Sequence, residues 1–478
     1  MYAFFDLLYY KGTRKQIEFY GKIYIGGGKL MNETFRFIHA ADLHLGSFLN
    51  INGKPSKEVE DLSKSAVYDG FETICHKAIS YKVDFILICG DVYDSYLRSV
   101  RGNRFFINQC LSLNEKNISV YVIYGNHDAI NDGQELFTMP TNVHILSSDS
   151  AECFEVYKEG QVIAKIIGKS YKRRNEKEKS YETYLLDNNV FNIAMLHTAL
   201  EKDNNNYIPC TLEDLKAVPN IDYWALGHIH TQSVLSNARP VIAFPGIPQG
   251  RDMGEQGVGG VFLVTACNKE IVNMEFLPIA AVVYKRFEII IDDEDKIENY
   301  SDLLRVIIEE TSSLTNAPRD DSNVTMRSKE EMHHEFKGHI IQLLVKGTTD
   351  FHRKIALMTE EDYKQFVENI NEEMSFLKCF IWIDSIIFRT TGAKQDFENL
   401  KMQNSIFEDL EQVINDFSID LEQKDQLVKN WGGIWKKQVY TENIDEDKFD
   451  FDDGVIEDII SQAKELLIEK LVEALEIT

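Results

Sequence analysis

Five stretches of the chain share one pattern, in which a run of apolar, β-branched or aromatic residues ends abruptly in polar side chains. They read FRFIHAADLH, VDFILICGDVYD, ISVYVIYGNHD, NNVFNIAMLHT and IDYWALGHIH. Apolar runs of this length are typical of buried strands. Between the early runs lie segments with apolar residues at helical spacing, such as SKSAVYDGFETICHKAISYK. Strands that alternate with helices predict an α/β fold, and continuous apolar strands predict sheets covered on both faces.

The polar residues that end these runs form one ordered set. In chain order the patterns are D-x-H, G-D-x-x-D, G-N-H-D, a single His and G-H-x-H. Active sites of α/β sheets gather beyond the carboxyl ends of the strands, so we expect these residues to meet at one site. The candidate metal ligands among them are Asp42, His44, Asp91, Asn126, His197, His228 and His230.

The number and chemistry of these groups favour two metal ions. Asp42 and His44 are two residues apart, so an extended segment would point both side chains to the same side. Asp91 can bridge two ions through its two oxygens. Oxygen and nitrogen ligands without thiolate suit Mn²⁺, Fe or Zn²⁺. Seven such groups overfill one site but fill two sites that share Asp91, and two ions about 3.5–4 Å apart would activate a water and hold the oxygens of a phosphoester.

Each residue alone has a simpler interpretation. A single buried His is usually structural, and an Asp at a strand end usually forms a turn or caps a helix. The ordered set, with every pattern placed after a strand, argues against this simpler interpretation.

These motifs resemble the calcineurin-like metallophosphoesterase superfamily. The stretches FIHAADLHLGS, CGDVYD, YGNHD, LHT and ALGHIH are most similar to its DNA-repair exonuclease branch, which includes SbcD-type and YhaO-like nucleases. The resemblance extends from about Phe35 to about residue 390. It implies a four-layer α/β/β/α sandwich with a small α+β capping domain and a C-terminal helical region.

The resemblance also implies a role for each residue of the set. One ion would be held by Asp42, His44, Asp91 and His230, and a second by Asp91, Asn126, His197 and His228. His127 would act as general acid toward the leaving oxygen or stabilise charge on the phosphoryl group. Asp94 would orient His127, and Asp128 would shape the turn. The expected cofactor is a pair of Mn²⁺ ions, with Mg²⁺, Fe and Zn²⁺ as alternatives.

Three features bear on the substrate. Protein phosphatases of the superfamily carry Arg in G-D-x-x-D-R-G, whereas this chain reads GDVYDSYLRS, which counts against a phosphoprotein substrate. Arg251, in the Gly-rich segment FPGIPQGRDMGEQG, is a candidate contact for a DNA backbone, although the segment could simply close the catalytic domain. The basic stretch KRRNEKEK at 172–179 is a further candidate for contact with DNA, but it is mixed with Glu, which is more typical of a solvated loop.

The domain boundaries follow from changes in pattern. Residues 31–280 are the predicted catalytic domain, residues 281–393 read as β-α-β-α-β and resemble a capping domain, and residues 394–478 are acidic and helix-like. The resemblance implies that this last region docks an SMC-like coiled-coil ATPase of SbcC type; the alternative is that its helices pack on the core. For residues 1–30 we expect either a mis-annotated extension, with the true start at Met31, or an additional packed element.

Charge and cysteine content limit the remaining choices. The net charge is −26, but residues 1–250 carry 26 basic and 29 acidic side chains, so most of the excess acid lies in the second half. A nearly neutral catalytic half with bound cations can still accept a polyanion. The seven Cys are scattered and lack a C-x-x-C pair, which is typical of reduced thiols. With no apolar run long enough to span a membrane and no signal-peptide pattern, the expected location is the cytoplasm.

The sequence therefore predicts a two-metal hydrolase that cleaves phosphodiester bonds in DNA repair. Exonuclease activity is expected, with endonuclease activity as an addition. The alternatives are a phosphodiesterase or nucleotidase for small phosphoesters, and a non-catalytic partner of the ATPase. The resemblance also suggests a homodimer.

Overall fold

The computed structural model describes residues 34–94, 100–130, 137–202, 206–312, 314, 336–375, 380–392, 400–402, 404–419 and short pieces between 460 and 475. The extension expected at residues 1–30 lies outside them. The chain divides into two compact units, the first made of residues 1–287, 307–344 and 360–387, and the second of residues 288–306, 345–359 and 388–478.

The first unit contains a six-stranded sheet in the order β12-β11-β1-β2-β3-β4. Its strands are β1 Thr34–Ala40, β2 Phe85–Cys89, β3 Ser119–Ile123, β4 Val143–Ile145, β11 Gly260–Cys267 and β12 Glu270–Pro278. Strands β1 to β4 are parallel, whereas β11 is antiparallel to both β1 and β12. The carboxyl ends of β1, β2 and β3 therefore lie at one edge of the sheet.

A second six-stranded sheet has the order β5-β6-β7-β8-β10-β9. Its strands are β5 Glu152–Lys158, β6 Gln161–Gly168, β7 Phe191–His197, β8 Tyr223–Gly227, β9 Ser233–Ser236 and β10 Val241–Phe244. Strands β6, β7, β8 and β10 are parallel, so β7 and β8 also end side by side.

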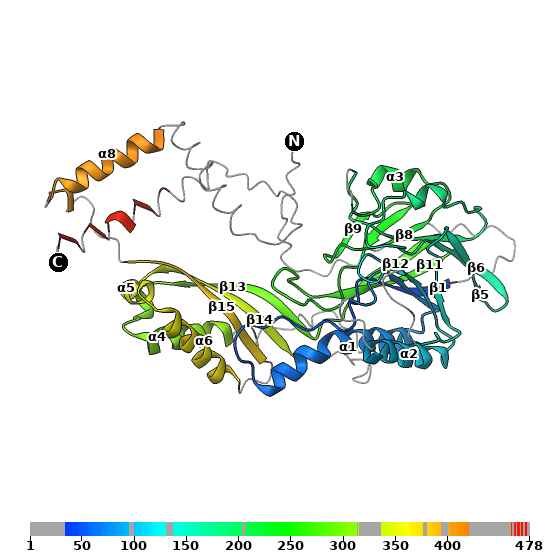
Figure 1. Ribbon diagram of the computed structural model, residues 1–478, viewed down its shortest axis with the longest axis horizontal. Helices are drawn as coiled ribbons and strands as arrows, with labels where there is room; N and C mark the ends of the chain where they lie inside the picture. The colour runs from blue at the N-terminus through cyan, green and yellow to red at the C-terminus, as the bar shows by residue number, and fades with distance from the viewer. Residues whose placement is uncertain are drawn as a thin grey trace. The chain divides into compact units, whose positions relative to one another are not determined.

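Helices cover the outer face of each sheet (Figure 1). Helices α1 (Lys57–Ser80) and α2 (Val100–Asn114) pack on the first sheet through one apolar cluster. Helix α3 (Leu212–Ala217) and the 3₁₀ turn η3 (Ser180–Thr183) pack on the second sheet through another. A third cluster fills the space between the sheets. This arrangement confirms the four-layer α/β/β/α sandwich.

The sequence dictates α1 through its cap and its apolar face. Ser56 accepts a hydrogen bond from the backbone N–H of Val59, and acidic residues in the first turn suit the positive end of the helix dipole. Its buried residues include Val67, Phe71 and Ile74, which recur at helical spacing.

The two sheets meet through an aromatic cluster. Alternate residues of β1 face opposite ways, so Phe37 lies between the sheets while Ile38 packs under the helices. The ring of Phe37 stacks on Phe85 of β2 at 5.1 Å and meets Tyr223 of β8 edge-on at 5.4 Å. One side chain thus joins strands of both sheets.

Truncation of this ring should destabilise the sandwich strongly. We expect Phe37→Ala to lower the free energy of unfolding by about 3–5 kcal/mol, because the substitution removes buried area and leaves a cavity. Urea unfolding followed by tryptophan fluorescence would measure the loss. Leu185→Ala, at a side chain that is 75% exposed, is the control and should change stability by less than about 0.5 kcal/mol. Equal stability of the two variants would contradict the inter-sheet role.

A three-stranded sheet follows, in the order β13-β14-β15. Its elements are β13 Val282–Ile291, η4 Asp293–Asp295, α4 Tyr300–Ser312, β14 Gly338–Thr348, α5 His352–Ala356, α6 Glu360–Met374 and β15 Phe380–Thr391. This order matches the predicted β-α-β-α-β pattern and confirms a small α+β region. The boundaries at residues 280 and 393 stay predictions.

Within the first unit, the loop after β1 is fastened to β15. The Asp384 carboxylate accepts hydrogen bonds from the backbone N–H and the side-chain amide of Asn52, both at 2.8 Å. Trp382 donates through its indole N–H to the Asn52 carbonyl at 3.2 Å. The loop that follows Asp42 and His44 is therefore anchored to β15 at Asn52.

The second unit contains α8 (Ile406–Ile419). Leu400 and the fully buried Phe407 pack against Ile468 and Leu471, so the beginning of α8 contacts the end of the chain. Both predicted C-terminal helical segments extend outside the described residues. Within the part of the chain that the structure describes, every helix is too short or too polar to cross a bilayer.

Candidate metal centre

All seven predicted ligands lie at the carboxyl ends of strands. Asp42 and His44 follow β1, Asp91 follows β2, and Asn126 follows β3 in the first sheet. His197 is the last residue of β7, and His228 and His230 follow β8 in the second sheet. The candidate site therefore takes side chains from both sheets.

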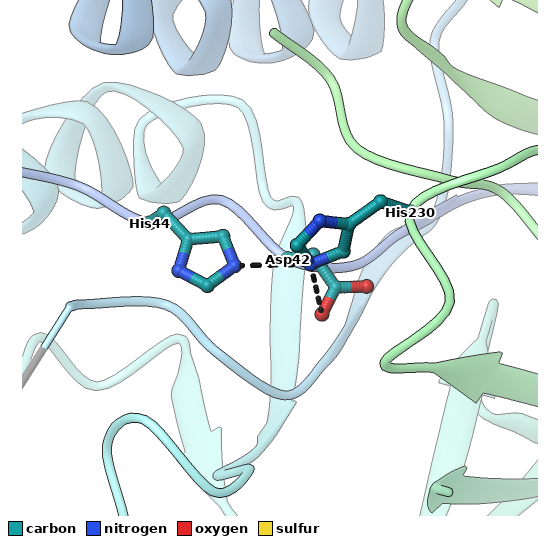
Figure 2. Close-up of side chains that lie close together, drawn as sticks. All are labelled: Asp42, His44 and His230. Atoms are coloured by element: carbon teal, nitrogen blue, oxygen red, sulfur yellow. Dashed lines mark hydrogen bonds and ion pairs between the residues drawn. The ribbon is translucent and has the colours of Figure 1, made fainter. Parts of the chain in front are cut away.

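Asp42, His44 and His230 form one group of side chains (Figure 2). One ligand atom from each lies within 4.8 Å of those of the other two. The Nε2 atoms of His44 and His230 are 3.3 Å apart, and His230 Nε2 lies 3.9 Å from Asp42 Oδ1. The two rings thus point nitrogen atoms at each other beside a buried carboxylate.

The remaining ligands form a second group. His197 Nε2 lies 3.4 Å from Asp91 Oδ2 and 2.9 Å from Asn126 Oδ1. His228 Nδ1 lies 3.2 Å from the same Asn126 oxygen. The structure thus brings together the two sets that the resemblance implied, although their roles as ligands stay predictions.

Asp91 connects the groups in a way that the sequence did not indicate. Its Oδ1 accepts the backbone N–H of His127 at 2.9 Å. Its Oδ2 faces both His197 Nε2 and, at 4.0 Å, His44 Nε2. One oxygen therefore lies between the two groups, whereas a bridge through both oxygens was expected from the sequence.

The backbone at the site is strained. Asp42, His44 and Asp91 have φ values of 52°, 46° and 51°, and His228 has a φ of 101°. The expectation that an extended segment aligns Asp42 with His44 was therefore wrong in its geometry. Hydrogen bonds from Asp42 N to Gly90 O at 3.0 Å and from His44 N to Asp91 O at 2.9 Å hold this conformation. Strain of this kind costs roughly 1–3 kcal/mol per residue and concentrates at functional sites.

Close approach explains two glycines of the motifs. A Cβ at Gly125 would lie 2.3 Å from Asp91 Oδ1 and 2.7 Å from His197 Nε2. A Cβ at Gly227 would lie 1.7 Å from the carbonyl oxygen of Cys89. Glycine at these positions lets the two sheets bring their ligands together.

Gly125→Ala tests this constraint. The added methyl group has to displace Asp91 or His197, and displacements of about 1 Å at a reacting centre can cost about 10²-fold in rate. We expect weaker Mn²⁺ binding, measured by calorimetry, and a phosphodiesterase rate lower by about that factor. Gly392→Ala is the matched control, because a Cβ there meets nothing within 4 Å. Unchanged Mn²⁺ binding by Gly125→Ala would contradict the predicted ligand positions.

Hydrogen bonds select the ring nitrogens that face the cluster. His197 Nδ1 lies 2.9 Å from the Cys89 carbonyl, which can only accept, so Nδ1 carries a proton and Nε2 is the nitrogen that points to Asp91. His44 Nδ1 is buried without a hydrogen-bond partner among the described residues. Its other nitrogen is the one directed at His230 and Asp91.

The electrostatics of the cluster fit a cation. Asp42 and Asp91 are both buried, and burial raises the pKa of Asp42 to about 6. Burial alone would lower the pKa of His197, but the charges of Asp91 and Asp42 raise it to about 9. The two buried carboxylates thus favour positive charge on the His197 ring, and a divalent metal ion in place of the Nε2 proton would supply that charge.

His127 and Asp94 lie beside the cluster. His127 Nδ1 is 3.6 Å from Asp94 Oδ1, and the Asp94 carboxylate raises the pKa of His127. Ser47 donates a hydrogen bond to the other Asp94 oxygen at 3.4 Å. The His127 ring meets the His44 ring edge-on at 4.9 Å. An imidazole whose protonated form is favoured by Asp94 thus lies next to the expected metal positions.

Asp128 ties the second and third motifs together, which supports the turn-shaping role expected from the sequence. Its carboxylate accepts backbone N–H groups from Val92 at 2.7 Å, Tyr93 at 3.3 Å and Gly125 at 2.7 Å. The loops that carry Asp91 and Asn126 are therefore fixed to one buried side chain.

Glu255 was not predicted from the sequence. Its Oε1 lies 2.7 Å from His230 Nδ1, and its carboxylate also binds the Arg251 guanidinium. A single Glu within the Gly-rich segment FPGIPQGRDMGEQG belongs to no motif that would identify it as part of a metal site. This pair brings Arg251, the candidate DNA contact, to the edge of the cluster.

One family model and several known proteins are similar to this chain. The family model for the calcineurin-like phosphoesterase matches residues 35–232, which include all seven predicted ligands. The uncharacterized metallophosphoesterase YhaO of Bacillus subtilis is 36% identical over 282 residues, which make up 58% of this chain and 68% of that protein.

Two archaeal proteins are also similar. The DNA double-strand break repair protein Mre11 of Methanocaldococcus jannaschii is 29% identical over 44% of this chain and 55% of its own length. Mre11 of Archaeoglobus fulgidus is 26% identical over 46% of this chain and 51% of its own length. The chain thus spans about half the length of these two relatives.

Proposed function

Because this chain belongs to the calcineurin-like metallophosphoesterase family, we propose that it is a metal-dependent DNA nuclease that hydrolyses phosphodiester bonds at DNA ends. The observation that carries the proposal is the convergence of seven oxygen and nitrogen ligands beside the His127–Asp94 pair. The similarity to two Mre11 proteins, whose names assign them to DNA double-strand break repair, supports DNA as the substrate.

The family implies divalent metal ions, and we propose two Mn²⁺ ions. Asp42, His44, Asp91 and His230 would hold one, and Asp91, Asn126, His197 and His228 the other. When bound, the ions would lower the pKa of a water and neutralise charge on the phosphoryl oxygens. Ligands that are oxygen and imidazole nitrogen support Mn²⁺, and Mg²⁺, Fe and Zn²⁺ are the alternatives that a metal panel separates.

In this proposal His127 supplies the proton for the leaving oxygen. Its pKa is raised by Asp94, which favours the imidazolium form that can donate a proton. Asp94 orients the ring through Nδ1, which leaves Nε2 for the phosphodiester. Asp91 also positions His127, because its Oδ1 accepts a hydrogen bond from the backbone N–H of His127.

Substrate access involves regions outside the cluster. We propose that residues 281–393 act as a capping domain that shapes DNA access, and that Arg251 contacts the DNA backbone. The Arg251 guanidinium contacts Glu255 through Nε and Nη2, so a phosphate would be met on its Nη1 side. The near balance of charge in residues 1–250 is compatible with a polyanion.

We propose an SMC-like coiled-coil ATPase as partner, docked on residues 394–478, and a homodimer as the assembly. On α8, Val413 is 64% exposed although Phe407 is buried against the chain end, so an apolar side chain is left on the surface of this acidic region.

The six Cys that the structure describes are free thiols, which supports a cytoplasmic location.

The test is cleavage of end-labelled linear duplex DNA by the purified protein with Mn²⁺, with Mg²⁺ and with chelator. Progressive shortening in Mn²⁺ that is lost in chelator supports an exonuclease, and cleavage of a covalently closed circle adds endonuclease activity. Faster turnover of small phosphodiesters than of DNA would instead favour a phosphodiesterase. No cleavage of either substrate, with or without the ATPase, would reject the nuclease and leave a non-catalytic partner.

A further inference from the structure

A carboxylate lies directly behind one of the predicted metal ligands. His230 Nε2 faces Asp42 and His44, while Nδ1 on the other side of the ring lies 2.7 Å from Glu255 Oε1. We propose that Glu255 is a positioning residue that sets the tautomer and the orientation of His230 and thereby the affinity of one metal ion. The inference rests on the proposed function through the role of His230 as a ligand.

The position of Glu255 is fixed by the loop that carries it. Its carboxylate accepts hydrogen bonds from Arg251 at three atoms: the backbone N–H at 2.7 Å, Nε at 3.1 Å and Nη2 at 2.6 Å. The Glu255 and Arg251 side chains are only 10% and 16% exposed. Gly250 passes so close that a Cβ there would lie 2.5 Å from the Glu255 carbonyl oxygen. Arg251 thus balances the charge of a carboxylate that points at the metal centre.

Glu255 determines which ring nitrogen carries the proton. An ionised carboxylate can only accept, so Nδ1 is the donor and the Nε2 lone pair is left for the cluster. The Cys89 carbonyl performs the same task for His197 in the second group, through a 2.9 Å contact to Nδ1. The His ligands of the two predicted ions are therefore held differently. A carboxylate side chain holds His230, and a backbone carbonyl holds His197.

This difference predicts that removal of Glu255 weakens the binding of one metal ion and not of the other. Removal of Glu255 frees the His230 ring to rotate or change tautomer and leaves the Arg251 guanidinium without its ion-pair partner. Loss of partners of this kind typically lowers metal affinity by about 10–100-fold. The ion held by Asp91, Asn126, His197 and His228 keeps all its contacts and should bind as before.

The experiment uses the full-length protein after treatment with chelator. Mn²⁺ is titrated by calorimetry, and electron paramagnetic resonance distinguishes a spin-coupled Mn²⁺ pair from an isolated ion. The variants are Glu255→Ala, which removes the carboxylate, and Glu255→Gln, which keeps an acceptor oxygen without the charge. Asp252→Asn is the matched control on the same loop, since its side chain accepts from Gly254 N and an amide oxygen can do the same.

We expect two Mn²⁺ in the wild type and in Asp252→Asn. Glu255→Ala should bind one Mn²⁺ as before and the other about 10–100-fold more weakly, with the signal of an isolated ion at stoichiometric Mn²⁺, and Glu255→Gln should lie between the two. Two ions bound with wild-type affinity by Glu255→Ala would overturn the inference. Equal weakening of both ions, with a lower melting temperature in both Glu255 variants, would also overturn it by showing a purely structural role.

The titration requires no DNA, so its outcome is separate from that of the nuclease assay. A wild-type protein that binds two Mn²⁺ without cleaving DNA would refute the proposed substrate and leave the role of Glu255 intact. A wild-type protein that binds fewer than two ions would overturn the inference together with its premise.

Discussion

His127→Ala is expected to lower the rate of DNA cleavage by about 10²–10⁴-fold, the usual contribution of a positioned general acid. The imidazole is paired with Asp94 at 3.6 Å and lies beside the metal cluster, but it is not among the predicted ligands. Mn²⁺ binding should therefore be close to that of the wild type. Steady-state cleavage of end-labelled duplex, together with a calorimetric Mn²⁺ titration, measures both quantities.

The leaving group distinguishes proton donation from other roles. A p-nitrophenyl phosphodiester of thymidine has a leaving group that departs without protonation, so His127→Ala should impair its hydrolysis much less than that of DNA. His76→Ala, at an exposed histidine of α1, serves as control and should cleave both substrates normally. An equal loss on both substrates would argue for charge stabilisation, and loss of Mn²⁺ binding would identify His127 as a ligand.

Asp91→Asn should abolish cleavage by removing both metal ions. The Asp91 Oδ2 atom faces ligands of both groups, and an amide supplies neither the charge nor a second anionic oxygen. Asn tolerates the positive φ of this position, so the substitution isolates the charge. Burial opposes the Asp91 charge, but His197 and His44 hold the pKa of Asp91 well below its usual range, so loss of this charge should make the metal-free variant less stable than metal-free wild type at neutral pH.

Thermal melting with and without Mn²⁺ provides the readout. A ligand at 100 times its Kd stabilises the native state by about 2.7 kcal/mol. Mn²⁺ should therefore raise the melting temperature of the wild type and leave the melting temperature of Asp91→Asn unchanged. Metal analysis of the dialysed proteins gives the stoichiometry directly. Asp149→Asn, at a side chain that is 78% exposed, should behave as wild type. A normal Mn²⁺-dependent rise in Asp91→Asn would refute the bridging position.

The strands of the site could be predicted because their signal is local. Buried parallel strands read as continuous apolar runs, and β2 (FILIC) and β8 (YWALG) lie within the predicted runs. The polar residues that follow each run could also be predicted to converge, because parallel strands share an edge. His197 was predicted from a single His after such a run, and it is fully buried at the end of β7.

Other features depend on contacts that no local pattern encodes. The division of the strands between two sheets follows from inter-sheet packing, such as that of Phe37 against Tyr223. The positive φ of Asp42 and His44 follows from hydrogen bonds to the loop after β2. Glu255 could not be found because its partner, His230, is 25 residues away and the intervening loop has no repeating pattern.

The contact between Asp42 and His228 sets the order in which the site can assemble. The Asp42 carboxylate accepts the His228 backbone N–H at 3.0 and 3.2 Å, across 186 residues of chain. A nascent chain that leaves the ribosome presents the first half of the cluster long before the second half exists. Until then the buried carboxylates have neither this donor nor the imidazoles of the second sheet. Contacts between residues so far apart in sequence slow folding, so we expect the centre to form late in folding.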